Sequence, residues 1–247
     1  MFVKKNIIKI HNNRRLYVKD SIAKEIPLTI KINKKELTTI LCSPSELKFL
    51  VYGYLFTEGV INEKKDVKEF VLDKRKTTAW VKVKKSFPLT FFDRRIIPSG
   101  CASFQLLYKP FFRNRRTSIE LKIEPIDIYR LGNRFQKKSE TFFKTGCIHS
   151  AGLIKQDFVL FSEDIGRHNA VDKIAGKMLL RDIKGNDKKL FLSGRVSSEI
   201  IYKSLRMDIP VVISQSAPTE LAVKIAKKYK VCLIGFLRGE RLNIYTE

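Results

Sequence analysis

Apolar residues in the second half of the chain come in short runs. Each run is followed by a polar loop and then by apolar positions at helical spacing. The runs are residues 158–161, 189–192 and 209–213. The helical positions are Ala170, Val171, Ile174, Met178 and Leu179 after the first run, Ile200, Ile201 and Leu205 after the second, and Leu221, Ile225 and Ala226 after the third. This order predicts three strand–loop–helix units, and residues 231–236 and 242–245 predict two final strands.

The three units predict a largely parallel sheet, because strands joined by right-handed helical crossovers run the same way. The loops after such strands lie along one rim, where open α/β sheets bind their ligands. The polar residues expected there are Gly166, Arg167, His168, Ser193, Gly194, Arg195, Ser197, Ser216, Arg238, Gly239 and Arg241.

The residue types at this predicted rim suit a diphosphate or a nucleotide. Glycine lets a backbone approach closely, while serine hydroxyls and helix N–H groups donate hydrogen bonds. Arginine matches phosphate oxygens with its planar donors. Two alternatives stay open. In the first, the glycines and serines are ordinary turn and cap residues. In the second, Glu163 and Asp164 pair with Arg167 and His168, and this loop needs no ligand.

The first half of the chain is richer in strands. Residues 29–33 alternate as in a strand with one wet face, and residues 69–72 and 78–83 predict a hairpin. A helix is expected to begin at the capping sequence of residues 43–46 and to stop at Gly59, with a buried stripe. The stripe consists of Leu47, Leu50, Val51, Tyr54 and Leu55.

Two further patterns lead into the second half of the chain. A helix is expected at residues 126–137, and a hairpin joins 148–154 to 158–161. We therefore divide the chain into a β-rich part at residues 1–120, with one capped helix and the Cys101 loop, and an α/β ligand-binding part at residues 121–247.

The composition indicates a globular protein with an anionic partner. The chain has 247 residues, 44% of them hydrophobic, which fits a globular fold, and a formal net charge of +24. Such a charge predicts attraction to an anion: nucleic acid, a membrane surface, an acidic protein or a phosphorylated cofactor. It is also compatible with an ordinary lysine-rich surface. An apolar segment of about 20 residues and a signal peptide are both missing from the pattern, so we expect a soluble cytoplasmic protein without membrane contact.

Four cysteines are scattered without metal-ligand spacing, so free thiols are expected. Cys101 follows Pro-Ser-Gly in a predicted exposed bend and is the best candidate nucleophile, although a lone cysteine is often a buried apolar residue. Cys42 and Cys232 lie in apolar runs and fit that second description. Cys147 lies in a polar loop near His149, which is either a general base or a core residue.

A basic and aromatic run at residues 109–116 gives a rival interpretation. Such residues bind single-stranded nucleic acid by charge and stacking, or form a solvated loop. A non-catalytic nucleic-acid-binding protein is therefore the alternative function.

Seven motifs together resemble the formate dehydrogenase accessory sulfurtransferase family, FdhD. They are residues 55–61, 99–101, 145–151, 163–173, 192–195, 216–218 and 236–245. The resemblance implies a cytidine-deaminase-like α/β fold with a mixed sheet. It also implies a homodimeric sulfur carrier that takes sulfur as a persulfide from a cysteine desulfurase. The carrier passes this sulfur to molybdenum in bis(molybdopterin guanine dinucleotide) for formate dehydrogenase.

By match to these motifs, Cys101 takes the persulfide role. The cofactor-binding role falls to Phe236, Leu237, Arg238, Gly239, Glu240 and Arg241. We add Gly166, Arg167, His168, Ser193, Gly194 and Arg195 from the predicted rim, and expect GDP-like nucleotides to mimic the cofactor. Nucleic acid is then not the expected partner.

The chain departs from the family pattern at two positions. Phe104 stands where many members carry a second cysteine, so Cys101 is expected to act alone. Cys147 stands where a second glycine is usual. The zinc signatures of deaminases are absent from the sequence, and we therefore expect neither zinc nor deamination.

Overall fold

The computed structural model describes residues 1–73, 75, 77–84, 95–96, 104–105 and 124–247. The predicted Cys101 loop, the basic run at 109–116 and the boundary near residue 120 lie outside these residues, as does the side chain of Phe104. No helix in the described part of the chain is long and apolar enough to cross a membrane.

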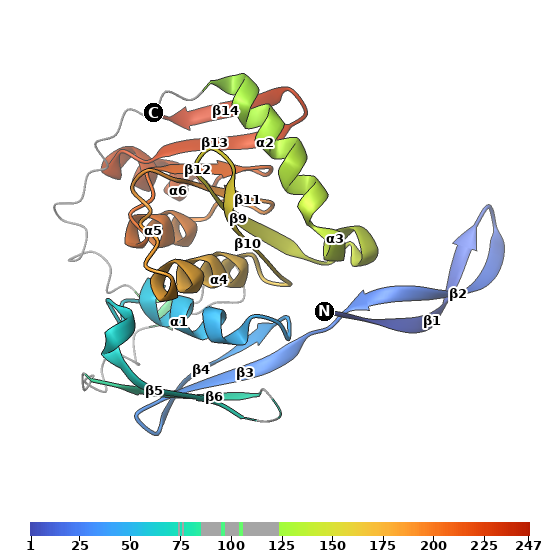
Figure 1. The fold of residues 1–247 in the computed structure, drawn as a ribbon. Coiled ribbons are helices and arrows are strands. Elements are labelled where there is room, and N and C mark those ends of the chain that lie inside the picture. Colours follow the sequence, from blue (N-terminus) through green and yellow to red (C-terminus); the bar gives the residue numbers. More distant parts are fainter. Residues whose placement is uncertain (74, 76, 85–94, 97–103, 106–123) are drawn as a thin grey trace.

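The larger half of the molecule is built on a six-stranded mixed sheet (Figure 1). Its strands, in spatial order, are β10 (Phe158–Asp164), β9 (His149–Ile154), β11 (Lys189–Leu192), β12 (Val211–Ser214), β13 (Cys232–Arg238) and β14 (Arg241–Thr246). Only the pairs β11–β12 and β12–β13 are parallel. The expectation of a largely parallel sheet is therefore wrong, because β9 inserts antiparallel between β10 and β11.

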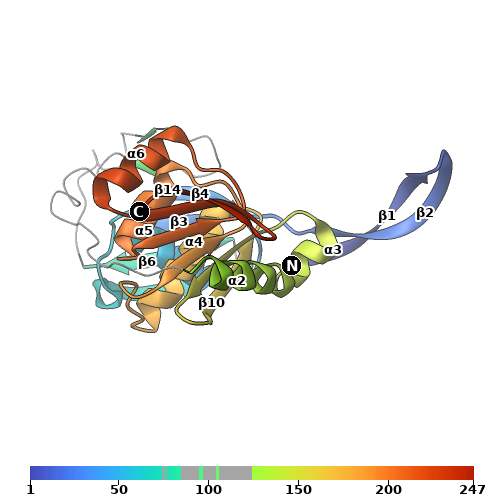
Figure 2. The same ribbon diagram turned by 90° about the horizontal axis from the view of Figure 1, so that it is seen from above.

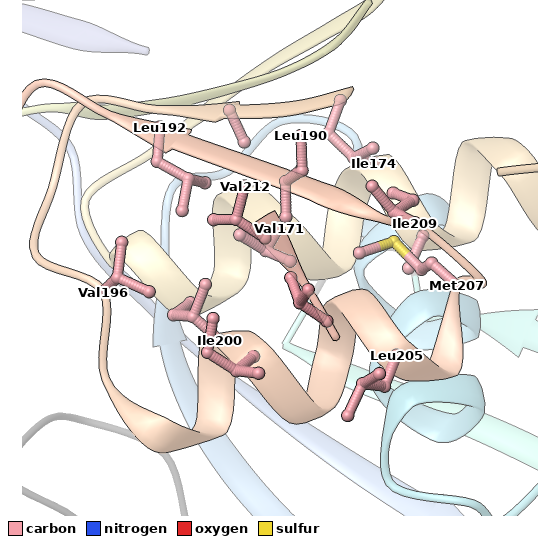
Figure 3. Packing of buried hydrophobic residues seen from close by; sticks show 14 of the residues in the cluster. Val171, Ile174, Leu190, Leu192, Val196, Ile200, Leu205, Met207, Ile209 and Val212 are labelled. Carbon is pink, nitrogen blue, oxygen red and sulfur yellow. The ribbon is translucent and has the colours of Figure 1, made fainter. Parts of the chain in front are cut away.

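Helices cover both faces of this sheet. On one face lie α4 (Arg167–Leu180), α5 (Ser198–Arg206) and α6 (Glu220–Tyr229), packed through a cluster that includes Val171, Ile174, Ile200, Leu190 and Val212 (Figure 3). On the other face lies α2 (Pro125–Lys138), which buries Ile128, Leu131 and Phe135 as the periodicity predicts. The short helix α3 (Glu140–Thr145) follows α2.

The smaller half is a four-stranded sheet with one helix on it. The strands, in spatial order, are β4 (Lys35–Cys42), β3 (Ile26–Ile32), β6 (Thr78–Val83) and β5 (Val67–Leu72), and a 3₁₀ turn (Lys64–Asp66) precedes β5. Helix α1 (Leu47–Thr57) packs on this sheet through the predicted stripe, and it also packs against α4. The α/β class, the mixed sheet and the N-terminal β-rich part are confirmed. Two short strands, β7 (Arg95–Ile96) and β8 (Phe104–Gln105), pair with each other.

The start of α1 differs from the predicted capping box. The helix begins at Leu47, and Glu46 adopts a left-handed backbone with φ 58° instead of completing a box with Ser43. The hydroxyl and amide of Ser43 bond to the loop before α4 instead: Ile165 N donates to Ser43 Oγ, and Ser43 N donates to Asp164. Glu46 forms an ion pair with Lys177. The predicted stop at Gly59 is correct, with φ 74°.

The N-terminus forms a separate two-stranded hairpin of β1 (Phe2–His11) and β2 (Arg14–Ala23), which projects from the body in both views (Figures 1 and 2).

Candidate functional site

The carboxyl ends of four strands meet at one edge of the large sheet, which we call the rim. β10, β11, β12 and β13 all point toward this edge, because β9 runs antiparallel to both of its neighbours. β9 therefore begins there, with His149 opposite Asp164. Helices α4 and α5 also start at the rim, so their unpaired N–H groups face the same edge. The single rim predicted from the sequence is present although the sheet is mixed.

Hydrogen bonds join the rim loops into one continuous edge. Val196 forms a parallel bridge with Pro218, and Ser214 Oγ donates to the carbonyl of Gly194 at 2.7 Å. Phe236 N donates to the carbonyl of Ser216 at 3.1 Å. Because the loops are bonded to each other, the rim is held in shape before any ligand arrives.

The loop that opens α4 is anchored by a fully buried ion pair. Asp164 and Lys173 have no exposed side-chain surface and lie 2.6 Å apart. Asp164 also accepts hydrogen bonds from the backbone N–H of Ser43 and Gly166 and from the amide of Asn169. The alternative of a loop that neutralises itself is replaced by other partners: Glu163 accepts from the hydroxyls of Ser139 and Thr141, and His168 contacts Glu199.

Replacing Lys173 with methionine is expected to destabilise the fold by about 3–5 kcal/mol, because it leaves the Asp164 carboxylate buried without a cation. Urea unfolding measures the loss. The matched control is Lys224→Met, which removes an exposed helical pair with Glu220 and costs at most about 0.5 kcal/mol. Similar losses in both variants would contradict the anchoring role of Lys173.

His168 points into the protein and not into the rim. Its side chain is 4% exposed, and Nε2 lies 2.8 Å from Glu199 and 3.2 Å from Ser197 Oγ. Burial lowers the pKa of His168, and the hydrogen bond to Glu199 opposes this only in part. His168 therefore ties the start of α4 to the start of α5.

His149 is the histidine that reaches the rim. Its Nδ1 lies 3.4 Å from Ser193 Oγ, which also accepts the amide N–H of Ser150. A Cβ atom at Gly194 would lie 3.0 Å from His149 Nδ1 and 3.3 Å from Arg167 Cβ, so both side chains pack closely against this glycine. Burial lowers the pKa of His149, and the charges of Arg167 and then of the neighbouring cations add to the effect. The ring is therefore neutral near pH 7 and can accept a proton.

Two neighbouring cavities lie between the rim and the α2–α3 segment. The first, of about 300 Å³, is lined by Ser139, Phe142, Cys147, His149, Ser150 and other residues. The second, of about 470 Å³, is lined by Gly132, Asn133, Ser216, Leu237, Arg238 and Gly239. The two cavities share three lining residues, Gln136, Ser193 and Gln215. We call the two cavities together the trough. The trough brings together residues from three predicted rim loops.

The hairpin at residues 236–241 borders the second cavity. Arg238 is exposed, and its Nε donates to the carbonyl of Gln215 at 3.4 Å. Leu237 is buried against Gly132 of α2. The guanidinium of Arg241 lies 5.8 Å from the ring of Phe236, and Glu240 is exposed at the turn.

Some predicted site residues are not among the residues that line the trough. Within the described residues, those outside both linings are Gly166, Arg167, His168, Gly194, Arg195, Phe236, Glu240 and Arg241. The sequence reasoning missed Asn133, Gln136 and Gln215, which line the trough. A signal for two of them existed: Asn133 and Gln136 flank the buried stripe of α2 at helical spacing.

The described cysteines differ in access. Cys42 is buried, and burial raises its pKa to about 12, while burial raises the pKa of Cys232 to about 11. Cys147 is exposed in the wall of the trough. In the described part of the chain, no three His, Cys, Asp or Glu residues gather as metal ligands. The absence of zinc stays a prediction.

Comparison with known proteins shows which family the chain belongs to. The model of the FdhD/NarQ family matches residues 23–247. The chain belongs to this family. It is 39% identical over 98% of its length to the sulfur carrier protein FdhD of Bacillus pumilus, of which it covers 95%. For the protein of the same name from Listeria innocua the identity is 37%, with 93% of this chain and 90% of that protein covered.

A solved structure has the same fold. A crystal structure described as that of a formate dehydrogenase accessory protein from Desulfotalea psychrophila superposes with a TM-score of 0.82. The superposition covers all of this chain and 97% of the other protein, and the two sequences are 24% identical. The match shows that the two proteins share a fold. The residues matched by the family model include the whole rim and Cys101, but not the first 22 residues.

Proposed function

We propose that the chain is a sulfur carrier for the maturation of formate dehydrogenase. The observation that carries this proposal is the family match over residues 23–247, together with a polar trough built from the matched rim motifs. Its curated relatives are named sulfur carrier proteins. The proposal places the protein in the cytoplasm and includes a homodimer.

Cys101 is the residue that would carry the sulfur. Its thiolate attacks the outer sulfur of a persulfide on a cysteine desulfurase, and the desulfurase thiolate leaves, so one S–S bond replaces another. Delivery to molybdenum would break the S–S bond and release the Cys101 thiolate, and molybdenum(IV) would supply the two electrons that reduce the transferred sulfur to sulfide, becoming molybdenum(VI). The direct test is whether a desulfurase loads sulfur onto Cys101, measured by mass spectrometry.

The trough would hold the bis(molybdopterin guanine dinucleotide) that receives this sulfur. Ser193, Ser216 and Arg238 supply hydrogen-bond donors and a cation for phosphate oxygens. The carboxamides of Gln136 and Gln215 both donate and accept, as the edge of a guanine or pterin requires. Neutral His149 adds an acceptor beside them.

Replacing Arg238 with alanine is expected to weaken GDP binding about tenfold or more, because a charge-assisted hydrogen bond contributes roughly 1.5–3 kcal/mol. Arg195→Ala and Arg241→Ala are expected to lose less, because neither side chain lines the trough. Isothermal titration calorimetry measures the affinities. The control is Arg181→Ala at the other end of α4, which leaves binding unchanged. If wild type and Arg238→Ala bound GDP with equal affinity, the proposal that the trough binds the nucleotide would be wrong.

A further inference from the structure

Two serine hydroxyls and a carboxylate form a chain of hydrogen bonds beside the first cavity of the trough. Glu163 of β10 lies directly opposite Ser150 of β9, so both side chains leave the sheet on the same face. Ser139, at the junction of α2 and α3, bonds to both of them. Ser150 Oγ donates to Ser139 Oγ at 3.0 Å, and Ser139 Oγ donates to Glu163 Oε1. We call these three groups the hydroxyl chain.

The carboxylate of Glu163 sets the direction of the hydroxyl chain. An ionised carboxylate only accepts hydrogen bonds, while a serine hydroxyl has one hydrogen and two lone pairs. Ser139 therefore gives its hydrogen to Glu163, and Ser150 gives its hydrogen to Ser139. Because both hydrogens are used within the hydroxyl chain, the two serines can only accept a hydrogen bond from a ligand.

The hydroxyl chain is almost fully buried and is held from two further sides. Ser139 and Ser150 are 5% and 3% exposed. Thr141 Oγ1 donates to the second carboxylate oxygen of Glu163 at 2.8 Å, and Lys173 Nζ donates to the backbone carbonyl of Glu163 at 2.9 Å. The acceptor character of the two serines is therefore set before a ligand binds.

Both serines line the first cavity, which has a volume of about 300 Å³. This volume lies at the lower end of the range for ligand pockets, so the cavity suits one ring system and not a whole dinucleotide. The two hydroxyl oxygens are 3.0 Å apart, which matches two neighbouring donors on one edge of a ring. A ring without such donors would leave buried acceptors without partners, which costs binding free energy.

We propose that Ser139 and Ser150 bind the amide–amine edge of a 2-amino-4-oxopyrimidine ring, and that Glu163 is the positioning residue that keeps both hydroxyls acceptors. This inference rests on the proposed function. The guanine and the pterin of bis(molybdopterin guanine dinucleotide) both have this edge, in which a ring N–H stands beside an amino group. Adenine has no ring N–H there, so the subsite selects against it.

The test compares ligands that differ by one amino group, using isothermal titration calorimetry on the full-length chain. Wild type is expected to bind GDP at least about tenfold more tightly than IDP, because IDP lacks the 2-amino group and leaves one buried acceptor without a donor. Pterin and pteridin-4-one form the corresponding pair for the other ring of the cofactor. The pair that shows the preference identifies the ring that occupies the first cavity.

Replacing Ser139 with alanine is expected to lower the ratio of the two affinities at least about fivefold, because one acceptor is lost and Ser150 regains a hydrogen. Glu163→Ala is expected to lower the ratio by a similar factor, although Glu163 is not among the described residues that line the first cavity. The double variant should lose no more than either single variant, since all three groups act as one chain. The matched control is Thr141→Val, which removes the other hydrogen bond to the same carboxylate and keeps the ratio within about twofold.

Three results would overturn the inference. In the first, wild type binds both members of each ligand pair equally well. In the second, Ser139→Ala and Glu163→Ala weaken both members of a pair by the same factor, as expected if the hydroxyl chain only holds α3 in place. In the third, Thr141→Val changes the ratio as much as Glu163→Ala does. If Glu163→Ala does not fold, Ser139→Ala alone decides between these results. If wild type binds GDP without preferring it to IDP, only this inference fails, whereas a chain that binds neither GDP nor pterin also contradicts the proposed cofactor-binding role.

Discussion

Gly53→Ala is expected to destabilise the protein by about 3 kcal/mol or more, because α1 and α4 cross with their backbones in contact. A Cβ atom at Gly53 would lie 1.7 Å from the carbonyl oxygen of Asp172 on α4. Gly176 makes the reciprocal contact, with a built Cβ 1.9 Å from the carbonyl oxygen of Phe49. Backbone atoms cannot rotate away as side chains do, so one helix has to shift.

A shift of α1 or α4 also strains buried polar contacts. Lys203 of α5 is almost fully buried and donates to Asp172 at 2.6 Å and to Thr57 of α1 at 3.0 Å. Three helices thus share one polar network at the crossing, and separating them leaves buried charges with fewer partners.

Thermal unfolding measures the effect of Gly53→Ala, which corresponds to a fall in Tm of roughly 6–12 °C for a chain of this length. The matched control is Gly59→Ala, just after the end of the same helix. Gly59 has open space around its Cβ position but a φ of 74°, so this change costs only about 1–2 kcal/mol of backbone strain. If the two variants unfolded at the same temperature, the close helix crossing would not be a source of stability.

Cys101→Ala is expected to abolish sulfur loading, because no described cysteine is suited to replace it in the proposed reaction. The thiols of Cys42 and Cys232 have pKa values raised to about 12 and about 11 by burial, so little thiolate forms near neutral pH. Cys147 is exposed, but it stands where the family resemblance predicts a glycine. Loading by a cysteine desulfurase, followed with labelled sulfur, measures the loss. Cys147→Ala is the matched control and is expected to retain loading.

The elements of the second half were predictable because each has its own local signal. The apolar runs before α4, α5 and α6 matched strands β10, β11 and β12, and the buried stripe of α2 lay where its period placed it. The sheet order was not predictable in this way. Nothing local to β9 indicates that it inserts between β10 and β11, because that position depends on contacts with Leu192 and its neighbours about 40 residues away.

The false start of α1 has the same origin. Residues 43–46 carry the composition of a capping box, but Ser43 bonds to Asp164 and Ile165 across more than 100 residues. Tertiary hydrogen bonds override a local preference of about 1 kcal/mol when they satisfy a buried carboxylate.

The site was predicted in part. Glycine, serine and arginine after the strands indicated the rim, since strand ends and turn residues are visible in a sequence. Asn133 and Gln136 were missed because they come from α2, which reaches the trough across the other face of the sheet. His168 was assigned to the ligand because it starts a helix, but its ring turns inward to Glu199.

The most direct test of the account is to find which cysteine carries sulfur. Wild-type protein is incubated with a cysteine desulfurase and cysteine, and the peptides are then mapped by mass spectrometry without reduction. The account predicts one added sulfur atom on the peptide that contains Cys101 and none on the peptides of Cys42, Cys147 and Cys232. Sulfur on Cys147 instead, or a wild-type chain that gains no sulfur, would contradict it.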